Sequence, residues 1–326
     1  MIVLSPELLP ITTKKFNHFD AFMNFSKQNN CVPDKLALLY FANDNIDEIS
    51  DTYLKGKYFY SANANSFTKN PNMMHDYLLK IKDYLNYNKY NLDILITAYN
   101  YTIAKRNELL DTLYNSNFVI KNYIDNFDII KSYSYWHLTD YENTSISTTL
   151  FFGGSGMYLT NGIQKPIVGA YNCLHKLYDE ILARGENYII TRDSKERKHM
   201  LILLFNYEHP SDKAELQINS DDRYQKFINK ERKKIHLTIN SLPYTECYIR
   251  EFSINRYHGN PYDRWLLMGK PETDVYHRGV DVVNNLLSAS SNPDYKEANL
   301  HINNNIFSYE VNMDPLEIKS IEITLK

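Results

Sequence analysis

Short apolar runs alternate with longer stretches that carry apolar residues at helical spacing along the first 185 residues. The short runs have the length of strands and cover residues 2–6, 35–41, 93–98 and 131–137. The longer stretches have the three- and four-residue spacing of an amphipathic helix and cover residues 16–29, 72–86, 107 onward and 168–182. Strands that alternate with helices form a parallel sheet with right-handed crossovers. We therefore expect four strand–helix units in this part of the chain.

The pattern changes after residue 185 to short runs that alternate between apolar and polar positions or are continuously apolar. They are separated by turn residues and cover 187–192, 199–206, 214–219, 234–240, 245–255, 301–311 and 318–325. Such a series predicts an antiparallel β-sandwich, with a helix over 278–288 as an insertion. We therefore predict two domains, residues 1–185 and residues 186–326.

Composition narrows the classes of function. A charged fraction of 23% and a net charge of −3 are ordinary for a globular protein and leave no electrostatic footprint for direct nucleic-acid binding or for an anionic membrane. The longest apolar runs, such as 200–205, are too short to span a bilayer. The N-terminus lacks the basic segment of a signal peptide, so a cytoplasmic location is predicted.

Cysteine and histidine give no sign of a cofactor. Cys31, Cys173 and Cys247 are isolated and odd in number, which favours reduced thiols over a disulfide framework. The ten histidines do not form the paired spacing of a zinc site. We therefore predict neither a metal nor an organic cofactor.

Five short motifs follow one another along most of the chain. They are LITAYN at 95–100, YSYW with a following Thr-Asp at 133–140, FGGSG at 152–156, KP at 165–166, and HGNP with later Trp, Met-Gly and Pro at 258–271. In this order the motifs resemble the β-xylosidase glycoside hydrolases, family thirty-nine. The resemblance implies a fold of α/β plus all-β class: the C-terminal half of a TIM-type (β/α)₈ barrel followed by an antiparallel β-sandwich.

The same resemblance implies a degenerate site. It places the family's nucleophilic glutamate at Ala98 and a family histidine at Leu39, and the strand with the acid/base glutamate has no counterpart in the sequence. Retaining glycosidases need two carboxyl groups about 5–5.5 Å apart, and alanine supplies none. We therefore predict that the chain is not an enzyme and has no catalytic residue.

A sugar-binding pocket can persist after its catalytic carboxylates are lost, because aromatic rings and the polar ends of side chains can bind sugars without them. The candidate pocket residues stand at the ends of the third and fourth strands and are Tyr99, Asn100, Trp136, His137 and Asp140. For Trp136, a wall of the barrel mouth is an alternative to a sugar platform. For Asp140, hydrogen bonding within the following loop is an alternative to ligand contact.

The degenerate site also resembles that of family thirty-nine modules at the C-terminus of AraC-type transcription regulators, the staphylococcal regulators of surface proteins and biofilm. We therefore predict a catalytically inactive regulatory domain for effector sensing or oligomerisation. Its expected partners are a carbohydrate or other small-molecule effector, and either the rest of the regulator or a second copy that covers the half barrel. Two alternatives stay open: a fragment of a retaining β-xylosidase whose nucleophile is mutated to alanine, and a purely structural interaction module.

Overall fold

The computed structural model describes residues 13–42, 68, 70–102, 107–140, 149–210, 231–271 and 282–326. The chain divides into two compact units. Unit 1 comprises residues 1–105 and 125–137, and unit 2 comprises residues 106–124 and 138–326. This division does not coincide with residue 185, and the predicted domain boundary stays a prediction. The strands predicted over 2–6 and 214–219 lie outside the described residues.

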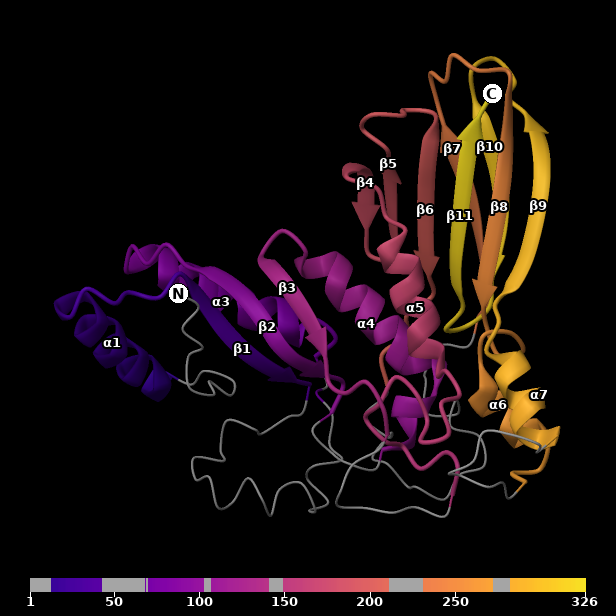
Figure 1. Cartoon of the computed structure of the whole chain (residues 1–326). Coiled ribbons are helices and arrows are strands. Elements are labelled where there is room, and N and C mark those ends of the chain that lie inside the picture. Colours follow the sequence, from indigo (N-terminus) through magenta and orange to yellow (C-terminus); the bar gives the residue numbers. More distant parts are fainter. Residues whose placement is uncertain are drawn as a thin grey trace. The chain divides into compact units, whose positions relative to one another are not determined.

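Unit 1 is built around a parallel sheet of three strands in the order β1-β2-β3 (Figure 1). Its described elements are α1 (Thr13–Gln28), β1 (Lys35–Phe41), α3 (Met73–Tyr87), β2 (Asp93–Asn100) and β3 (Ile130–Tyr135). The nearly continuous apolar character of β1 and the start of β2 fits strands that are covered on both faces. Helix α3 buries one stripe of its surface, including Leu78 and Ile81.

Strand β2 has an irregularity near its C-terminal end. Leu38 of β1 is paired with Ile96, whereas Leu39 is paired with Ala98, so Thr97 is an extra residue in β2. The Thr97 hydroxyl donates a hydrogen bond to the Leu38 carbonyl, at 3.3 Å. A bulge of this kind shifts the faces to which later side chains point. It therefore decides the direction of every side chain in the remainder of β2.

Unit 2 combines helices with two antiparallel sheets. Its helices are the 3₁₀ helix η3 (Glu108–Asp111), α4 (Leu113–Asn126, which continues into unit 1 for its last two residues), α5 (Pro166–His175), α6 (Pro261–Leu267) and α7 (Val282–Ser290). Its strands are β4 (Glu180–Gly185), β5 (Tyr188–Arg192), β6 (His199–Phe205), β7 (Lys233–Ile239), β8 (Glu246–Ile254), β9 (Asp294–His301), β10 (Phe307–Met313) and β11 (Ile318–Leu325). One sheet has the order β4-β5-β6-β11-β8-β9, and the other pairs β10 with β7.

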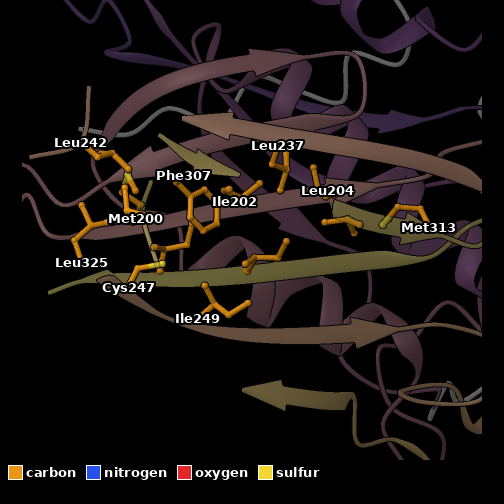
Figure 2. Packing of buried hydrophobic residues seen from close by; sticks show 14 residues of the cluster. Met200, Ile202, Leu204, Leu237, Leu242, Cys247, Ile249, Phe307, Met313 and Leu325 are labelled. Atoms are coloured by element: carbon orange, nitrogen blue, oxygen red, sulfur yellow. The ribbon is translucent and has the colours of Figure 1, made fainter. Parts of the chain in front are cut away.

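The two sheets of unit 2 enclose a shared apolar core, in which Phe307 lies among side chains from both sheets (Figure 2). The six-stranded sheet contributes Ile202 and Ile249, and the two-stranded sheet contributes Leu237 and Val311. Alternate residues of β10 are buried, which is the period of a strand with one face on a core. Sheet-on-sheet packing therefore holds this part of unit 2 together.

Two elements differ from the sequence-based predictions. The helix predicted over 168–182 ends at His175, because residues 180–185 form strand β4 at the edge of the six-stranded sheet. The strand predicted over 301–311 is two strands, β9 and β10, joined by a turn in which Asn304 and Asn305 have φ of 54° and 62°. Asparagine tolerates this left-handed conformation, so the chain reverses there.

The half barrel remains a prediction, since the described part of unit 1 contains three parallel strands. Within the described residues, no helix has the length and apolar character needed to cross a membrane.

Candidate functional site

Leu39 and Ala98 are register partners on the neighbouring strands β1 and β2. Ala98 is 2% exposed and Leu39 is half-buried. Neither side chain has an atom that can donate or accept a proton. At these two positions, unit 1 therefore offers an apolar surface and no acid, base or nucleophile.

The ring of Tyr99 packs in the interior of unit 1. It is fully buried and lies between Tyr40, whose ring centroid is 6.1 Å away, and Tyr133, at 4.6 Å. The Tyr133 hydroxyl in turn donates to the sulfur of Met74 on α3, at 3.4 Å. Tyr99 was predicted to line a pocket, but these contacts place its ring in the layer between the sheet and α3. We therefore leave it out of the candidate pocket.

Asn100 and Trp136 are linked across the ends of β2 and β3. The Asn100 side-chain amide donates to the Trp136 carbonyl, and the Trp136 backbone N–H donates to the Tyr99 carbonyl at 2.9 Å. Asn100 is fully buried, so its side chain holds the backbone of Trp136 in place. The backbone of Trp136 is thus fixed to the end of β2, while its side chain is exposed.

Trp136 and His137 form an aromatic pair at the C-terminal end of β3. Trp136 is 44% exposed, and its ring centroid is 3.9 Å from that of the half-buried His137. An exposed tryptophan face is a common platform for the C–H face of a sugar, because the ring removes apolar area from water without requiring a charge. The sequence singled out both residues, and their role in a pocket stays a prediction.

Asp140, the fifth predicted pocket residue, belongs to a buried ion cluster in unit 2. Lys165 Nζ lies 2.6 Å from Asp111 Oδ1 and 2.8 Å from Asp140 Oδ2, and all three side chains are fully buried. The Lys165 ammonium also donates to the Gly154 carbonyl at 2.8 Å. Asp140 Oδ1 accepts from the Gly156 N–H at 2.7 Å. The carboxylate therefore binds the glycine-rich loop and is closed off from solvent.

The charges of this cluster shift its protonation equilibria. Burial raises the pKa of Asp140 to about 6, with Lys165 opposing and Asp111 reinforcing the change. Burial alone would lower the pKa of Lys165, but the two carboxylates raise it overall. Lys165 therefore stays charged at neutral pH, whereas Asp140 titrates near pH 6.

The glycine-rich loop needs its glycines for close approach. A Cβ on Gly156 would lie 2.2 Å from the Thr139 carbonyl carbon, and one on Gly154 would lie 2.5 Å from Asp140 Cγ. Gly153 has φ of 74° and donates its N–H to Asp111 Oδ2 at 2.7 Å. The backbone of this loop therefore surrounds the ion cluster. A phosphate-binding loop surrounds a phosphate in a similar way, but this loop binds side chains of the protein itself.

The HGNP motif also has a structural role. Asn260 caps α6, because its side-chain oxygen accepts from the Asp263 N–H and its amide donates to Asp263 Oδ2 at 2.9 Å. Trp265 on the same helix is buried and donates its Nε1–H to the Pro271 carbonyl at 3.0 Å. These residues stabilise the helical part of unit 2 and present no reactive group.

Sequence reasoning did not identify Asp111 and Lys165 as partners of Asp140. Lys165 stood in a motif that resembles the family, which was a usable signal, whereas Asp111 follows no motif. Among the described residues, no cluster of His, Cys, Asp or Glu could hold a metal ion. The expectation of no metal and no cofactor stays a prediction.

The family model "Glycosyl hydrolases family 39" matches residues 15–292. The chain belongs to this family. Its curated relatives include a β-xylosidase of Geobacillus stearothermophilus, 27% identical over 182 residues, which are 56% of this chain and 32% of that protein. A β-xylosidase of Caldicellulosiruptor saccharolyticus is 24% identical over 241 residues, 72% of this chain and 45% of that protein. The chain thus spans less than half of the length of these relatives.

Solved structures show the same fold. A monomeric β-xylosidase from Caulobacter crescentus matches with a TM-score of 0.75 at 16% identity, over 94% of this chain and 58% of that chain. A family 39 enzyme from Xanthomonas axonopodis pv. citri matches with a TM-score of 0.75 at 14% identity, over 94% of this chain and 57% of that chain. At such identities the likeness establishes the fold alone.

These findings correct the prediction that the chain is not an enzyme. That prediction is wrong, since the family model and the β-xylosidase relatives point to a glycosidase. It relied on one side chain, Ala98, and on a strand with no counterpart in the sequence. The alignments leave more than half of these relatives uncompared, so one alanine does not decide the chemistry.

Proposed function

We propose that this chain is the glycoside-recognising part of a longer family 39 protein, and that a β-xyloside stacks on Trp136. The observation that carries the proposal is the 44% exposed Trp136 ring at the C-terminal end of a parallel strand, in a chain of a glycosidase family. Ligands of sheets built from parallel strands bind outside these strand ends. The named relatives are β-xylosidases, which makes xylosides the first ligands to test.

The chemistry of the neighbouring residues suits a sugar ring. The Trp136 face offers apolar contact to the C–H face of a sugar, and the half-buried His137 ring lies beside it. Asn100 supports this arrangement, because its side-chain amide binds the Trp136 carbonyl and fixes the backbone there. Binding by stacking and hydrogen bonds requires no carboxylate at position 98.

Tryptophan fluorescence tests the proposal directly, because the chain has two tryptophans. Trp265 is 6% exposed and is held by its bond to Pro271, so a sugar-dependent change reports on Trp136. We expect xylobiose to change the emission of the wild type and of Trp265→Phe, and to leave Trp136→Phe unchanged. An unchanged wild-type spectrum at millimolar xylose and xylobiose, with no heat in calorimetric titration, would overturn the proposal.

Hydrolysis is a separate question for the longer protein. Ala98 has no oxygen with which to attack a glycosidic carbon, so turnover requires carboxylates from other positions. The longer protein should be assayed with p-nitrophenyl β-xyloside beside Ala98→Glu. Equal activity in both would assign the nucleophile to another residue. Activity only in the variant would support the alternative that position 98 carries an altered nucleophile.

The finer proposal is that the longer protein is an AraC-type regulator and that this module senses a sugar effector. Its support is the resemblance of the chain to such modules and the apolar pair Leu39 and Ala98. The partner that would cover the sheet of unit 1 is then the upstream part of that protein, or a second copy. Reading the gene upstream of codon 1 tests this. A helix-turn-helix sequence there favours a regulator, whereas an Asn-Glu-Pro strand that carries the family's acid/base glutamate favours a β-xylosidase.

A further inference from the structure

The six-stranded sheet of unit 2 has two faces with different surroundings. Cys247 and Ile249 of β8 belong to the apolar core between the two sheets. Because successive side chains of a strand point to opposite faces, the even-numbered residues of β8 lie on the outer face. Strands β8 and β9, at one edge of the sheet (Figure 1), pair without a register shift. The outer strip, as we call this surface, consists of Tyr248, Arg250 and Phe252 on β8 and their partners Asn299, Glu297 and Tyr295 on β9.

Tyr295 presents nearly half of its surface to solvent, with an exposed fraction of 47%. Its ring centroid lies 5.1 Å from that of Phe252, its register partner. Phe252 is half-buried, and Lys176 Nζ lies 3.8 Å from its ring centroid. Phe252 therefore supports the Tyr295 ring, and Tyr295 is the residue whose ring a ligand can reach. A supported aromatic ring of this kind can stack on the C–H face of a sugar.

A second ring, that of Tyr248, lies at the other end of the outer strip. Positions 248 and 252 are four residues apart, which is about 13 Å along an extended strand. Tyr248 is half-buried, and its hydroxyl is hydrogen-bonded to Glu297. The Lys326 ammonium and the Arg250 guanidinium lie 5.4 Å and 5.8 Å from its ring centroid. The strip therefore has an aromatic ring near each end, at a separation longer than a single sugar ring.

Polar groups lie between the two rings. Arg250 Nε is 3.5 Å from Glu297, and Arg250 Nη1 is 3.6 Å from Glu322 of β11. Beside them, Lys326 Nζ donates to Asn299 Oδ1 at 3.1 Å. A guanidinium has five N–H donors, and each carboxylate has several acceptor positions. These groups therefore suit the hydroxyls of a sugar, which both donate and accept hydrogen bonds.

The charges of the outer strip are compensated locally. Arg250 lies between two carboxylates, and Lys176 Nζ lies 2.7 Å from Glu322. Acidic and basic groups that are interspersed in this way produce little net field, which gives a nucleic acid or another strongly charged partner no electrostatic advantage. The surface therefore suits a neutral ligand with apolar faces and hydroxyl groups.

We propose that the outer strip binds a neutral β-linked xylo-oligosaccharide and forms a second carbohydrate-binding surface, on unit 2. The two rings stack on separate sugar units, and the polar groups between them bind hydroxyls. The chain belongs to a glycoside hydrolase family, which makes a glycan the natural occupant of such a surface. The ligand class is that of the proposed function, but the surface is a different one, because Trp136 belongs to unit 1.

The test needs a tyrosine of similar exposure outside the outer strip. Tyr188 of β5 is 38% exposed, and its register partner Leu204 belongs to the core between the sheets. Tyr188 therefore lies on the opposite face of the same sheet. Tyr188→Ala removes the same side chain as Tyr295→Ala and should leave sugar binding unchanged, whereas Tyr295→Phe keeps the ring at the proposed surface.

Native electrophoresis in gels that contain soluble arabinoxylan measures the binding. All variants carry Trp136→Ala, so that the site proposed in unit 1 does not contribute. We expect the polysaccharide to retard the Trp136→Ala protein, and Tyr295→Ala to weaken its affinity about fivefold to tenfold through loss of ring stacking. Tyr295→Phe and Tyr188→Ala should retain the affinity. Equal affinity with and without Tyr295→Ala, or no retardation of the Trp136→Ala protein, would overturn the inference.

The length of the sugar gives a second measurement. In the Trp136→Ala protein, calorimetric titration should show that xylohexaose binds more tightly than xylobiose, because the longer sugar reaches both rings. Tyr248→Ala, checked for folding by circular dichroism, should reduce the affinity for xylohexaose to that for xylobiose. Equal affinities for the two sugars before this change would contradict a surface with two rings.

The inference and the proposed function fail separately. Binding that Trp136→Ala abolishes and Tyr295→Ala leaves unchanged would overturn the inference and retain the proposed function, and the opposite result would overturn the proposed function alone. Sedimentation tests for a second copy as the occupant. Self-association that Tyr295→Ala removes, in a protein that binds no xylan, would assign the outer strip to contact between copies and overturn the inference.

Discussion

Lys165 and Asp111 form an ion pair with 2.6 Å between Nζ and Oδ1, and both side chains are fully buried. Asp111 stands in a 3₁₀ helix and Lys165 precedes α5, so the pair joins two segments that are distant in sequence. A buried pair of this kind repays its desolvation only while every partner is present.

Removing the lysine charge should therefore destabilise unit 2. Lys165→Met leaves Asp111 and Asp140 as two buried carboxylates without their shared cation, and we expect a loss of roughly 3–5 kcal/mol. Urea unfolding measures it. Lys176→Met is the control, because the Lys176–Glu322 pair is exposed to solvent and should contribute about 0–1 kcal/mol. Similar losses in both variants would argue against a special role of the buried cluster.

The protonation of Asp140 should make the free energy of unfolding depend on pH. Its pKa in the folded protein, about 6, lies above the ordinary value of 3.8, so the folded state binds the proton more tightly than the unfolded state. The contribution of this group to stability is therefore present below about pH 4 and is lost as pH rises through 6, on the order of 3 kcal/mol. Unfolding free energies of the wild type and Asp140→Asn between pH 4 and 7 test the sign. A variant curve parallel to that of the wild type would contradict it.

The glycine-rich loop gives a prediction that separates crowding from backbone strain. Gly156→Ala places a Cβ 2.2 Å from the Thr139 carbonyl carbon, so we expect a loss of more than about 2 kcal/mol. Gly269→Ala is the comparison: φ is 82°, but no atom lies within 4 Å of the added Cβ, so the cost should stay at about 1 kcal/mol. Thermal unfolding of both variants measures the difference, and the reverse order would show that the loop relaxes.

Two neighbours on β10 and its turn test the sandwich core. Phe307 is 1% exposed between the two sheets, and Phe307→Ala should cost about 3–5 kcal/mol through lost burial and a cavity. Ile306 is 40% exposed, and Ile306→Ala should cost less than about 1 kcal/mol. Chemical denaturation at constant pH compares them. A small effect of Phe307→Ala would mean that the two sheets do not depend on their shared core.

Local pattern was sufficient where burial is uniform along an element. Strands β1 and β6 and the start of β2 are nearly continuously apolar, and helix α3 has apolar residues at helical spacing, so their type followed from sequence. Strand β9 was missed in part because most of its residues are exposed and polar. An edge strand of this kind gains its order from pairing with β8, and pairing leaves little trace in hydrophobicity.

The candidate site also has a part that the sequence predicts and a part that only the structure shows. Sequence singled out Trp136 and His137, because aromatic residues after a strand are visible in one short motif. It could not place the ring of Tyr99, since the extra residue Thr97 in β2 changes the face to which later side chains point. That bulge is visible only in the register between neighbouring strands.

By itself, the sequence determined the alternation of strands and helices in the first part of the chain, the predominance of strands in the last part, and the likeness to family 39. The tertiary structure alone decided that Asp111, Asp140 and Lys165 share one buried cluster. The physical reason is the sequence separation over which each interaction acts. Helical or strand periodicity and turn preferences depend on residues that are close together in the sequence. The partner of a buried charge depends on which distant segments pack together and exclude water.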